Sequence, residues 1–286
     1  MITSTLMFVV VTGIVRYLGS DLPAAEAAFI RYAFGIVIMG PAIWKMLKAP
    51  PPGSVIKNGA IRGLAHTFGV TLWFFAMARV PIAEVTAIGY VTPIFITIGA
   101  ALFLGETLRL RRMMGVLAGL LGAFVILRPG FNELSIGQLA QLGTAPLFAI
   151  SYLMTKSMTN KTDSQTIVVL LTVFCTLFLF PLALLDWRNP TIEELFWLFG
   201  TALAATFGHY AMTRALQAAP ISVTQPIIFL QLVWASILGI TMFGEPIDPY
   251  VILGGTIIVA AATFISHRES KLGKKHITPP PTATKS

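Results

Sequence analysis

The chain contains the same long apolar segment twice, and this duplication constrains the fold more than any other feature. The first copy runs from Ala78 to Glu106 and the second from Gln217 to Glu245. Each copy has Pro-Ile near its start and Gly-Glu at its end, and the two copies are 139 residues apart. An apolar run of this length suits a helix that crosses a hydrocarbon core roughly 30 Å thick. The sequence therefore indicates an internal duplication of membrane spans.

The composition excludes an ordinary soluble domain. Hydrophobic residues make up 56% of the 286 residues and charged residues 11%, with a mean hydropathy of +0.80. Soluble domains carry roughly 25% charged residues. We therefore expect an all-α polytopic membrane protein that contacts the lipid bilayer. The single cysteine, Cys175, excludes an internal disulfide and a cysteine-cluster metal site, and we expect neither a metal nor a cofactor.

Apolar stretches predict about ten transmembrane helices. The first five form a repeat over residues 1–130, the next five form a repeat over 131–268, and the basic tail over 269–286 is expected to be disordered and cytoplasmic. The expected spans are 2–19, 24–44, 56–78, 82–104, 111–128, 135–156, 165–185, 192–216, 221–243 and 250–267.

The basic residues predict the orientation. With the N-terminus in the cytoplasm, 15 lysines and arginines, Arg62 among them, fall on the inner side, and three, Arg79, Arg128 and Arg188, fall on the outer side. This asymmetry predicts a multi-pass protein of the cell inner membrane with both termini cytoplasmic. The net charge of +8 thus reports topology, and we expect no nucleic-acid partner.

The offset between the copies predicts their relative orientation. It carries five spans, an odd number, so the second copy enters the membrane from the opposite side. The result is two inverted five-helix repeats, an arrangement typical of secondary transporters, in which two similar halves expose a central site to each side in turn.

Three stretches together with the paired segments resemble a known family. They are LPAAEAAFIRYAFG from Leu22 to Gly35, GVLAGLLGAFVIL from Gly115 to Leu127, and FLQLVWASILGITMFGE from Phe229 to Glu245. With two five-span repeats, the chain resembles the EamA-domain family of the drug/metabolite transporter superfamily. The resemblance covers nearly the whole chain apart from the tail. It implies a carrier of amino acids, nucleotide-like metabolites, vitamins or toxic organic compounds, with spans one, three, four, six, eight and nine around a central cavity.

Two charged residues inside the spans are candidates for a gate. Arg31 and Glu84 are expected at similar depth in spans two and four, so they could pair. The pair would act as an outer gate or as an anchor for a substrate carboxylate. The alternative is a fixed ion pair that only ties two helices together.

Two histidines are candidates for the cavity. His66 shares one helical face with Trp73 in span three, and His209 lies deep in span eight. A histidine at this depth could relay protons at physiological pH or donate a hydrogen bond to substrate. The alternative is a neutral histidine bonded to a neighbouring helix.

Polar and aromatic residues of the duplicated spans form the remaining candidates. A mixture of amides, hydroxyls and large rings suits a pocket for a small organic molecule with a flat or apolar part. The same groups could equally form interhelical hydrogen bonds. The candidates are Tyr90, Thr92, Gln225, Gln231 and Trp234.

These features favour a secondary transporter of a small organic metabolite: amino-acid-like, nucleoside-like or vitamin-like. No Gly-x-x-x-x-Gly-Lys-Ser/Thr loop is present, which disfavours an ATP-driven pump, so the driving force would be a proton gradient or an exchanged metabolite. The rival hypotheses are a non-transporting sensor or scaffold and an intramembrane enzyme. Gly115 and Gly119 predict close helix packing, with a homodimer contact as the alternative.

Overall fold

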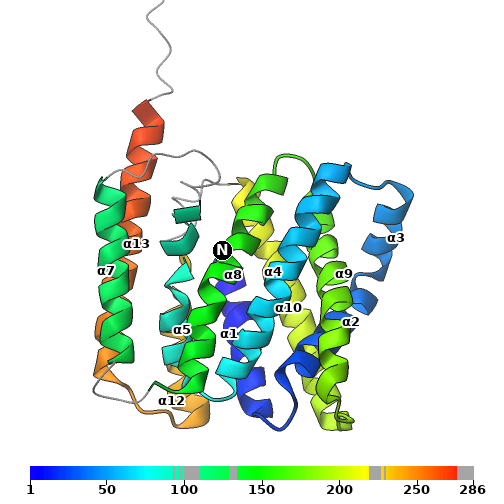
Figure 1. Ribbon diagram of the computed structural model, residues 1–286, viewed down its shortest axis with the longest axis horizontal. Helices are drawn as coiled ribbons and strands as arrows, with labels where there is room; N and C mark the ends of the chain where they lie inside the picture. Colours follow the sequence, from blue (N-terminus) through cyan, green and yellow to red (C-terminus); the bar gives the residue numbers. More distant parts are fainter. Residues whose placement is uncertain are drawn as a thin grey trace, which may run out of the picture.

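A computed structural model describes residues 1–92, 94–96, 98–99, 110–128, 134–218, 227–228 and 230–275. Within these ranges all regular structure is helical, which confirms the all-α prediction. The helices (Figure 1) are α1 (Ile2–Leu18), α2 (Ala24–Ile38), α3 (Gly40–Lys48), α4 (Gly53–Met77), α5 (Ile82–Gly89), α7 (Leu110–Leu127), α8 (Ile136–Met158), α9 (Ser164–Ala183), the 3₁₀ turn η1 (Leu184–Asp186), α10 (Ile192–Ala218), α12 (Leu230–Phe243) and α13 (Pro249–Lys275).

The helices stand side by side in one bundle, with α7 and α13 at one edge and α3 at the opposite edge (Figure 1). The main contacts join helices from the two halves of the chain: α1 with α10, α2 with α9, α4 with α8, α5 with α12, and α7 with α13. Because each of these pairs combines an early helix with a late one, the two halves share one interior.

The expected second span is broken in two. Instead of one helix over 24–44, α2 ends at Ile38 and α3 begins at Gly40, and the two axes differ by 67°. Pro41 lies in the first turn of α3. Its ring lacks an N–H and collides with the preceding turn of a continuing helix, so a bend here is the favourable solution.

Few of the helices could cross a membrane by themselves on length and hydropathy alone. Among the described residues, the segment Ser164–Asp186 passes such a test unaided, and α2 passes it only when joined to α3. Several other helices carry charges in their terminal turns, as α10 does at Glu193 and Glu194. The count of ten spans and the inverted arrangement therefore stay predictions.

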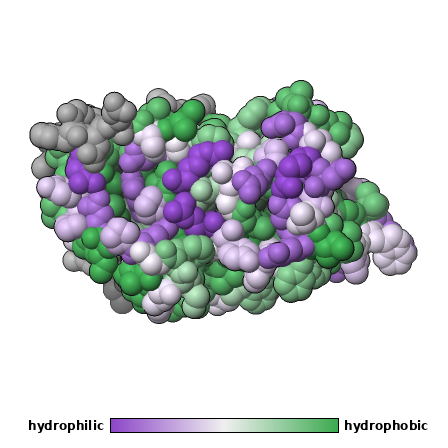
Figure 2. Space-filling view, turned by 90° about the horizontal axis from the view of Figure 1, so that it is seen from below, coloured by the Kyte–Doolittle hydropathy of each residue, from purple (hydrophilic) through white to green (hydrophobic). Residues whose placement is uncertain are grey.

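Apolar side chains cover the outside of the bundle. Phe199, Leu203 and Phe207 form an exposed stripe on α10, and Leu121 and Phe124 form one on α7. In a water-soluble protein such helical stripes face the core. Figure 2 views the bundle end-on from below, where hydrophilic residues form a band across the middle and hydrophobic residues form the rim. An apolar girdle around polar ends is what a membrane protein needs.

Glycines bring α7 and α13 into close contact. A Cβ on Gly122 would lie 2.7 Å from the Gly254 carbonyl oxygen, and one on Gly254 would lie 2.5 Å from the Gly122 oxygen. Close packing of the fifth and tenth predicted spans is thus present within one chain. Gly115 and Gly119 lie on α7, but their surroundings are outside the described part.

The C-terminal helix is longer than expected. We predicted disorder from residue 269, but α13 continues to Lys275. Glu269, Lys271 and Leu272 have high helix propensity, which lets the helix extend beyond its apolar part. Residues 276–286 lie outside the described part.

Candidate functional site

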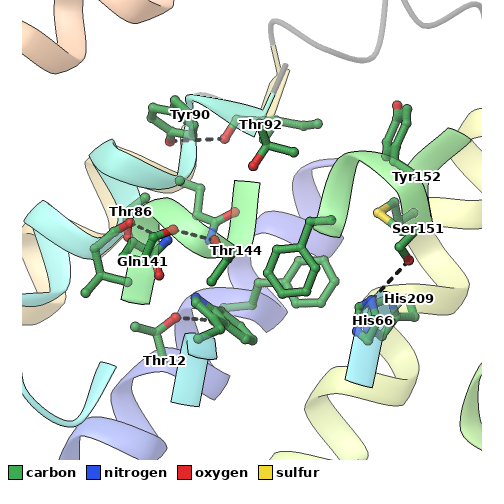
Figure 3. Close-up of a pocket in the computed structure, with 18 of the residues that line it drawn as sticks. Thr12, His66, Thr86, Tyr90, Thr92, Gln141, Thr144, Ser151, Tyr152 and His209 are labelled. Atoms are coloured by element: carbon green, nitrogen blue, oxygen red, sulfur yellow. Dashed lines mark hydrogen bonds between the residues drawn. The ribbon is translucent and has the colours of Figure 1, made fainter. Parts of the chain in front are cut away.

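A cavity of about 220 Å³ lies in the shared interior of the bundle. Its walls come from α1, α2, α4, α5, α8, α10 and α12, with the residues that follow α5. Seven of the ten predicted site residues line it: Arg31, His66, Trp73, Tyr90, Thr92, His209 and Gln231. Figure 3 shows the histidines at one end of this cavity and a group of hydroxyl and amide side chains at the other.

The two histidines meet across α4 and α10. Their ring centroids are 5.4 Å apart, with the planes inclined by 70°. His66 Nδ1 lies 3.1 Å from the Ser151 hydroxyl oxygen, whereas His209 Nδ1 is buried and has no hydrogen-bond partner among the described residues. Phe8 packs edge-on against His209 at 5.1 Å. The sequence predicted that both histidines could face a cavity, and the structure also places them in contact.

An aromatic wall follows the same face of α4. The Trp73 ring lies two turns beyond His66, and the Phe148 ring of α8 lies between them. Ring centroids are 5.0 Å apart for His66 and Phe148, and 6.1 Å apart for Trp73 and Phe148. Flat apolar surfaces of this kind suit a ligand ring.

Amide and hydroxyl groups form the opposite end of the cavity. The Tyr90 hydroxyl donates to the Ile228 carbonyl at 3.4 Å, which links the first copy of the duplicated segment to the second. Gln141 Nε2 donates to the Val85 carbonyl at 3.0 Å, and Gln141 Oε1 is buried with no partner in the part of the chain that the structure describes. An acceptor left open beside a cavity is available to a ligand donor.

Sequence reasoning missed the contribution of α8. This helix begins with a capping box between Ser135 and Gln138 and then directs one face at the cavity. The spacing of the residues on that face matches one helical stripe, which was a readable signal in the sequence. The α8 residues that line the cavity are Gln141, Thr144, Phe148, Ser151, Tyr152 and Thr155.

Arg62 was counted with the basic residues of the inner side, but the structure buries it. Its side chain is 1% exposed, lines the cavity, and donates from Nη1 to the Ile167 carbonyl at 3.0 Å. The reason is that α4 begins as early as Gly53, which carries Arg62 well into the helix.

The predicted pair between Arg31 and Glu84 does not form. Arg31 stacks over the Tyr32 ring at 4.1 Å and faces the cavity. Glu84 instead accepts a hydrogen bond from Gln138 of α8 and lines a second cavity of about 130 Å³ near Glu245. Equal depth did not bring the two side chains together, because Glu84 on α5 faces the start of α8 and not α2.

The predicted residue Trp234 lies elsewhere. Trp234 shares α12 with Gln231, yet it packs against a cluster of Val9, Ile82 and Ala235 and does not line the cavity. Gln225 lies outside the described residues.

Comparison with known proteins decides the family. The model of the EamA-like transporter family matches the chain twice, over residues 1–128 and 135–267. The chain belongs to the EamA-like transporter family. Its relatives are transporters of the drug/metabolite superfamily, so this EamA-like protein is a membrane transporter.

Several characterised relatives of this EamA-like transporter extend over nearly its whole length. A riboflavin transporter of Vibrio cholerae is 29% identical and aligns over 96% of this chain and 94% of its own. A riboflavin transporter of Rhizobium johnstonii is 31% identical over 88% and 84%. An S-adenosylmethionine uptake transporter of Rickettsia prowazekii is 26% identical over 91% and 89%.

A solved crystal structure has the same fold. It is 18% identical, aligns with 95% of this chain and 97% of its own, and has a TM-score of 0.62. This likeness supports the helical fold and nothing beyond the fold.

Proposed function

We propose that this EamA-like protein is a secondary carrier that moves a small organic metabolite across the cell inner membrane by alternating access. One observation carries the proposal: the central cavity is lined by α1, α2, α4 and α5 from the first half and by α8, α10 and α12 from the second. A site shared by two halves can open to either side when the halves rock against each other.

The pattern of helix contacts supports an inverted pair of five-span repeats. If the first five spans correspond in order to the last five, then α2 corresponds to α9, α5 to α12 and α7 to α13, and the two helices of each pair are in contact. Exchanging the two halves then turns the α1–α10 contact into the α8–α4 contact. It likewise turns the α2–α10 contact into the α9–α4 contact. An interior with this pseudo-symmetry has a natural second state in which the two halves exchange conformations.

A polar network closes the end of the bundle that we assign to the outer side. Glu245, at the end of α12, accepts from Arg16 Nε of α1 at 3.1 Å and from the Ile82 amide of α5 at 2.8 Å. Three cavity-lining helices are thereby tied at one end, which suits a gate. The basic residues of the sequence orient this end outward, with both termini cytoplasmic.

The substrate that fits best is a compact metabolite with a planar ring. The cavity combines the Trp73 and Phe148 rings with the open Gln141 acceptor. Its volume is below the roughly 300–1,000 Å³ of sites for drug-sized ligands. Relatives named for riboflavin and S-adenosylmethionine also handle ring-bearing metabolites. Transport would be driven by a proton gradient or by exchange, and no enzymatic step is proposed, because the family consists of transporters.

Ligand-dependent stabilisation of the purified protein, followed by counterflow in proteoliposomes, tests the proposal. A metabolite present at 100 times its dissociation constant should stabilise the fold by about 2.7 kcal/mol. Trp73→Ala should abolish that stabilisation and the counterflow, whereas Trp44→Ala should retain both, because Trp44 is 62% exposed on α3. If Trp73→Ala retains both, the site assignment is wrong. If no metabolite is exchanged by any variant, the carrier itself is refuted.

A further inference from the structure

Among the residues that the structure describes, the central cavity holds two buried guanidinium groups and no carboxylate. Arg31 on α2 is 4% exposed and Arg62 on α4 is 1% exposed, and both line the cavity. Among the lining residues that the structure describes, none is Asp or Glu. A buried cation costs several kcal/mol unless a counterion or a dense set of hydrogen bonds compensates it.

Arg31 has no counterion in the described part of the chain. Its guanidinium carbon lies 4.1 Å from the centroid of the neighbouring Tyr32 ring, and no ion pair is formed among the described residues. The buried acid on the same helix, Glu26, accepts from the Arg188 backbone amide and makes no ion pair with Arg31. Donors of the Arg31 fork that Tyr32 does not use are therefore available to a group inside the cavity.

Arg62 is only partly satisfied. Nη1 donates to the Ile167 carbonyl, while Nε is buried and finds no partner within the described ranges. Arg62 lies one helical turn before His66 on the same face of α4. Both guanidinium groups lie near enough to interact electrostatically with His66 and with His209. The histidine end of the cavity is therefore its cationic end.

We propose that the transported metabolite carries a carboxylate, which binds between Arg31 and Arg62 while its ring packs against Trp73 and Phe148. This inference rests on the proposed carrier function and narrows its substrate to small aromatic or heteroaromatic carboxylic acids. A carboxylate accepts two parallel hydrogen bonds from one guanidinium fork, and such charge-assisted bonds are about twice as strong as neutral ones. The compact cavity suits one ring and one acid group.

A comparison of aromatic acids with their uncharged amides separates the contribution of the carboxylate charge to binding from that of the ring. We would measure the dissociation constants of benzoate, benzamide, indole-3-acetate and indole-3-acetamide for the full-length protein in detergent, at constant ionic strength. Each acid should bind at least about tenfold more tightly than its amide, the factor expected for a charge-assisted hydrogen bond. Equal binding of acid and amide, or no binding of either acid, overturns the proposal.

Substitution of the two arginines tests whether they cause the preference for the acid. Arg31→Gln and Arg62→Gln should each remove the preference for the acid over the amide. Arg214→Gln is the matched control, because Arg214 is exposed on α10 and lies outside the cavity. A preference that survives both cavity variants refutes the assignment. If these variants do not fold, the acid–amide comparison on the unsubstituted protein decides alone.

Two further outcomes distinguish the failure of this inference from the failure of the carrier. Inorganic phosphate that stabilises the protein as strongly as the acids would show a general anion site with no role for the ring, and would refute the proposal. An uncharged metabolite that is exchanged in counterflow and lost in Trp73→Ala would refute the carboxylate site alone. The proposed carrier function would remain in that case.

Discussion

The Nε atom of Arg16 lies 3.1 Å from Oε1 of Glu245, which joins the end of α1 to the end of α12. Arg16 Nη1 also donates to the Ala78 carbonyl at 3.1 Å, and the second Glu245 oxygen accepts from the Ile82 amide. Glu245 thus accepts from the first amide of α5, so one carboxylate links the two copies of the duplicated segment.

Replacing this carboxylate should loosen one end of the bundle. The Arg16 and Glu245 side chains are 24% and 9% exposed, so this pair is partly buried, and removing one partner should cost more than the roughly 0–1 kcal/mol of an exposed pair. We expect Glu245→Ala to lower the unfolding temperature clearly and to reduce counterflow. Asp248→Asn is the control: it keeps an oxygen that can accept from the Tyr250 amide and removes only the charge that pairs with Arg128, and a pair about 30% exposed on both sides contributes about 0–1 kcal/mol. Equal losses in the two variants would contradict a closing role for Glu245.

The contact between α7 and α13 should tolerate no side chain at its centre. Gly122→Ala would place a Cβ 2.7 Å from the Gly254 carbonyl oxygen and 2.6 Å from Ile258. Backbone cannot move aside cheaply, so we expect a loss of about 1–3 kcal/mol in the free energy of unfolding. Gly53→Ala, with nothing within 4 Å of the added atom, should be neutral or stabilising. Thermal unfolding in detergent measures both, and an unchanged Gly122→Ala would refute the close approach.

Gln141 should contribute to ligand binding through its open oxygen. Gln141→Leu keeps the apolar volume but removes the acceptor that faces the cavity, and we expect the ligand to bind about 5–10-fold more weakly. The matched control is Gln165→Leu, on the exposed side of the first turn of α9. Dissociation constants from ligand titration provide the comparison. Equal affinities for Gln141→Leu and the control would remove Gln141 from the site.

Asp163 should make the start of α9 sensitive to acid. Its carboxylate caps the helix, with Oδ1 accepting from the Thr166 amide at 3.0 Å and Oδ2 from the Thr166 hydroxyl at 2.7 Å. Partial burial opposes the charged form, but these hydrogen bonds outweigh it and hold the pKa of Asp163 below its ordinary value. The cap therefore contributes its full stability above the unfolded pKa of about 3.9 and loses it as the pH falls through the lower folded pKa.

A pair of substitutions tests the charge and the cap separately. Asp163→Ala should cost about 1 kcal/mol near neutral pH, the usual contribution of an N-cap. Asp163→Asn should keep most of the capping but remove this part of the acid dependence, since an amide does not titrate. Unfolding temperatures between neutral pH and pH 3 give both quantities. An unchanged acid dependence in Asp163→Asn would show that other groups account for it.

Local patterns in the sequence were sufficient for the fold class and for part of the cavity. Apolar runs require burial in lipid or protein, which predicted an all-helical membrane protein. Helical periodicity placed His66 and Trp73 on one face of one helix, and both line the cavity. The break between α2 and α3 had a local cause in Pro41, although the span was predicted as continuous.

What the sequence alone determined is the kind of molecule: a duplicated, lipid-embedded transporter with polar and aromatic side chains turned inward at known helical positions. Only the tertiary structure decided which of those side chains meet. It placed Arg31 and Arg62 in one cavity, turned Glu84 away toward Gln138, and seated Trp234 in a different cluster. The physical reason is that hydropathy and periodicity are properties of neighbouring residues. The rotation and partner of each helix are set by packing between segments more than a hundred residues apart, as in α1 with α10.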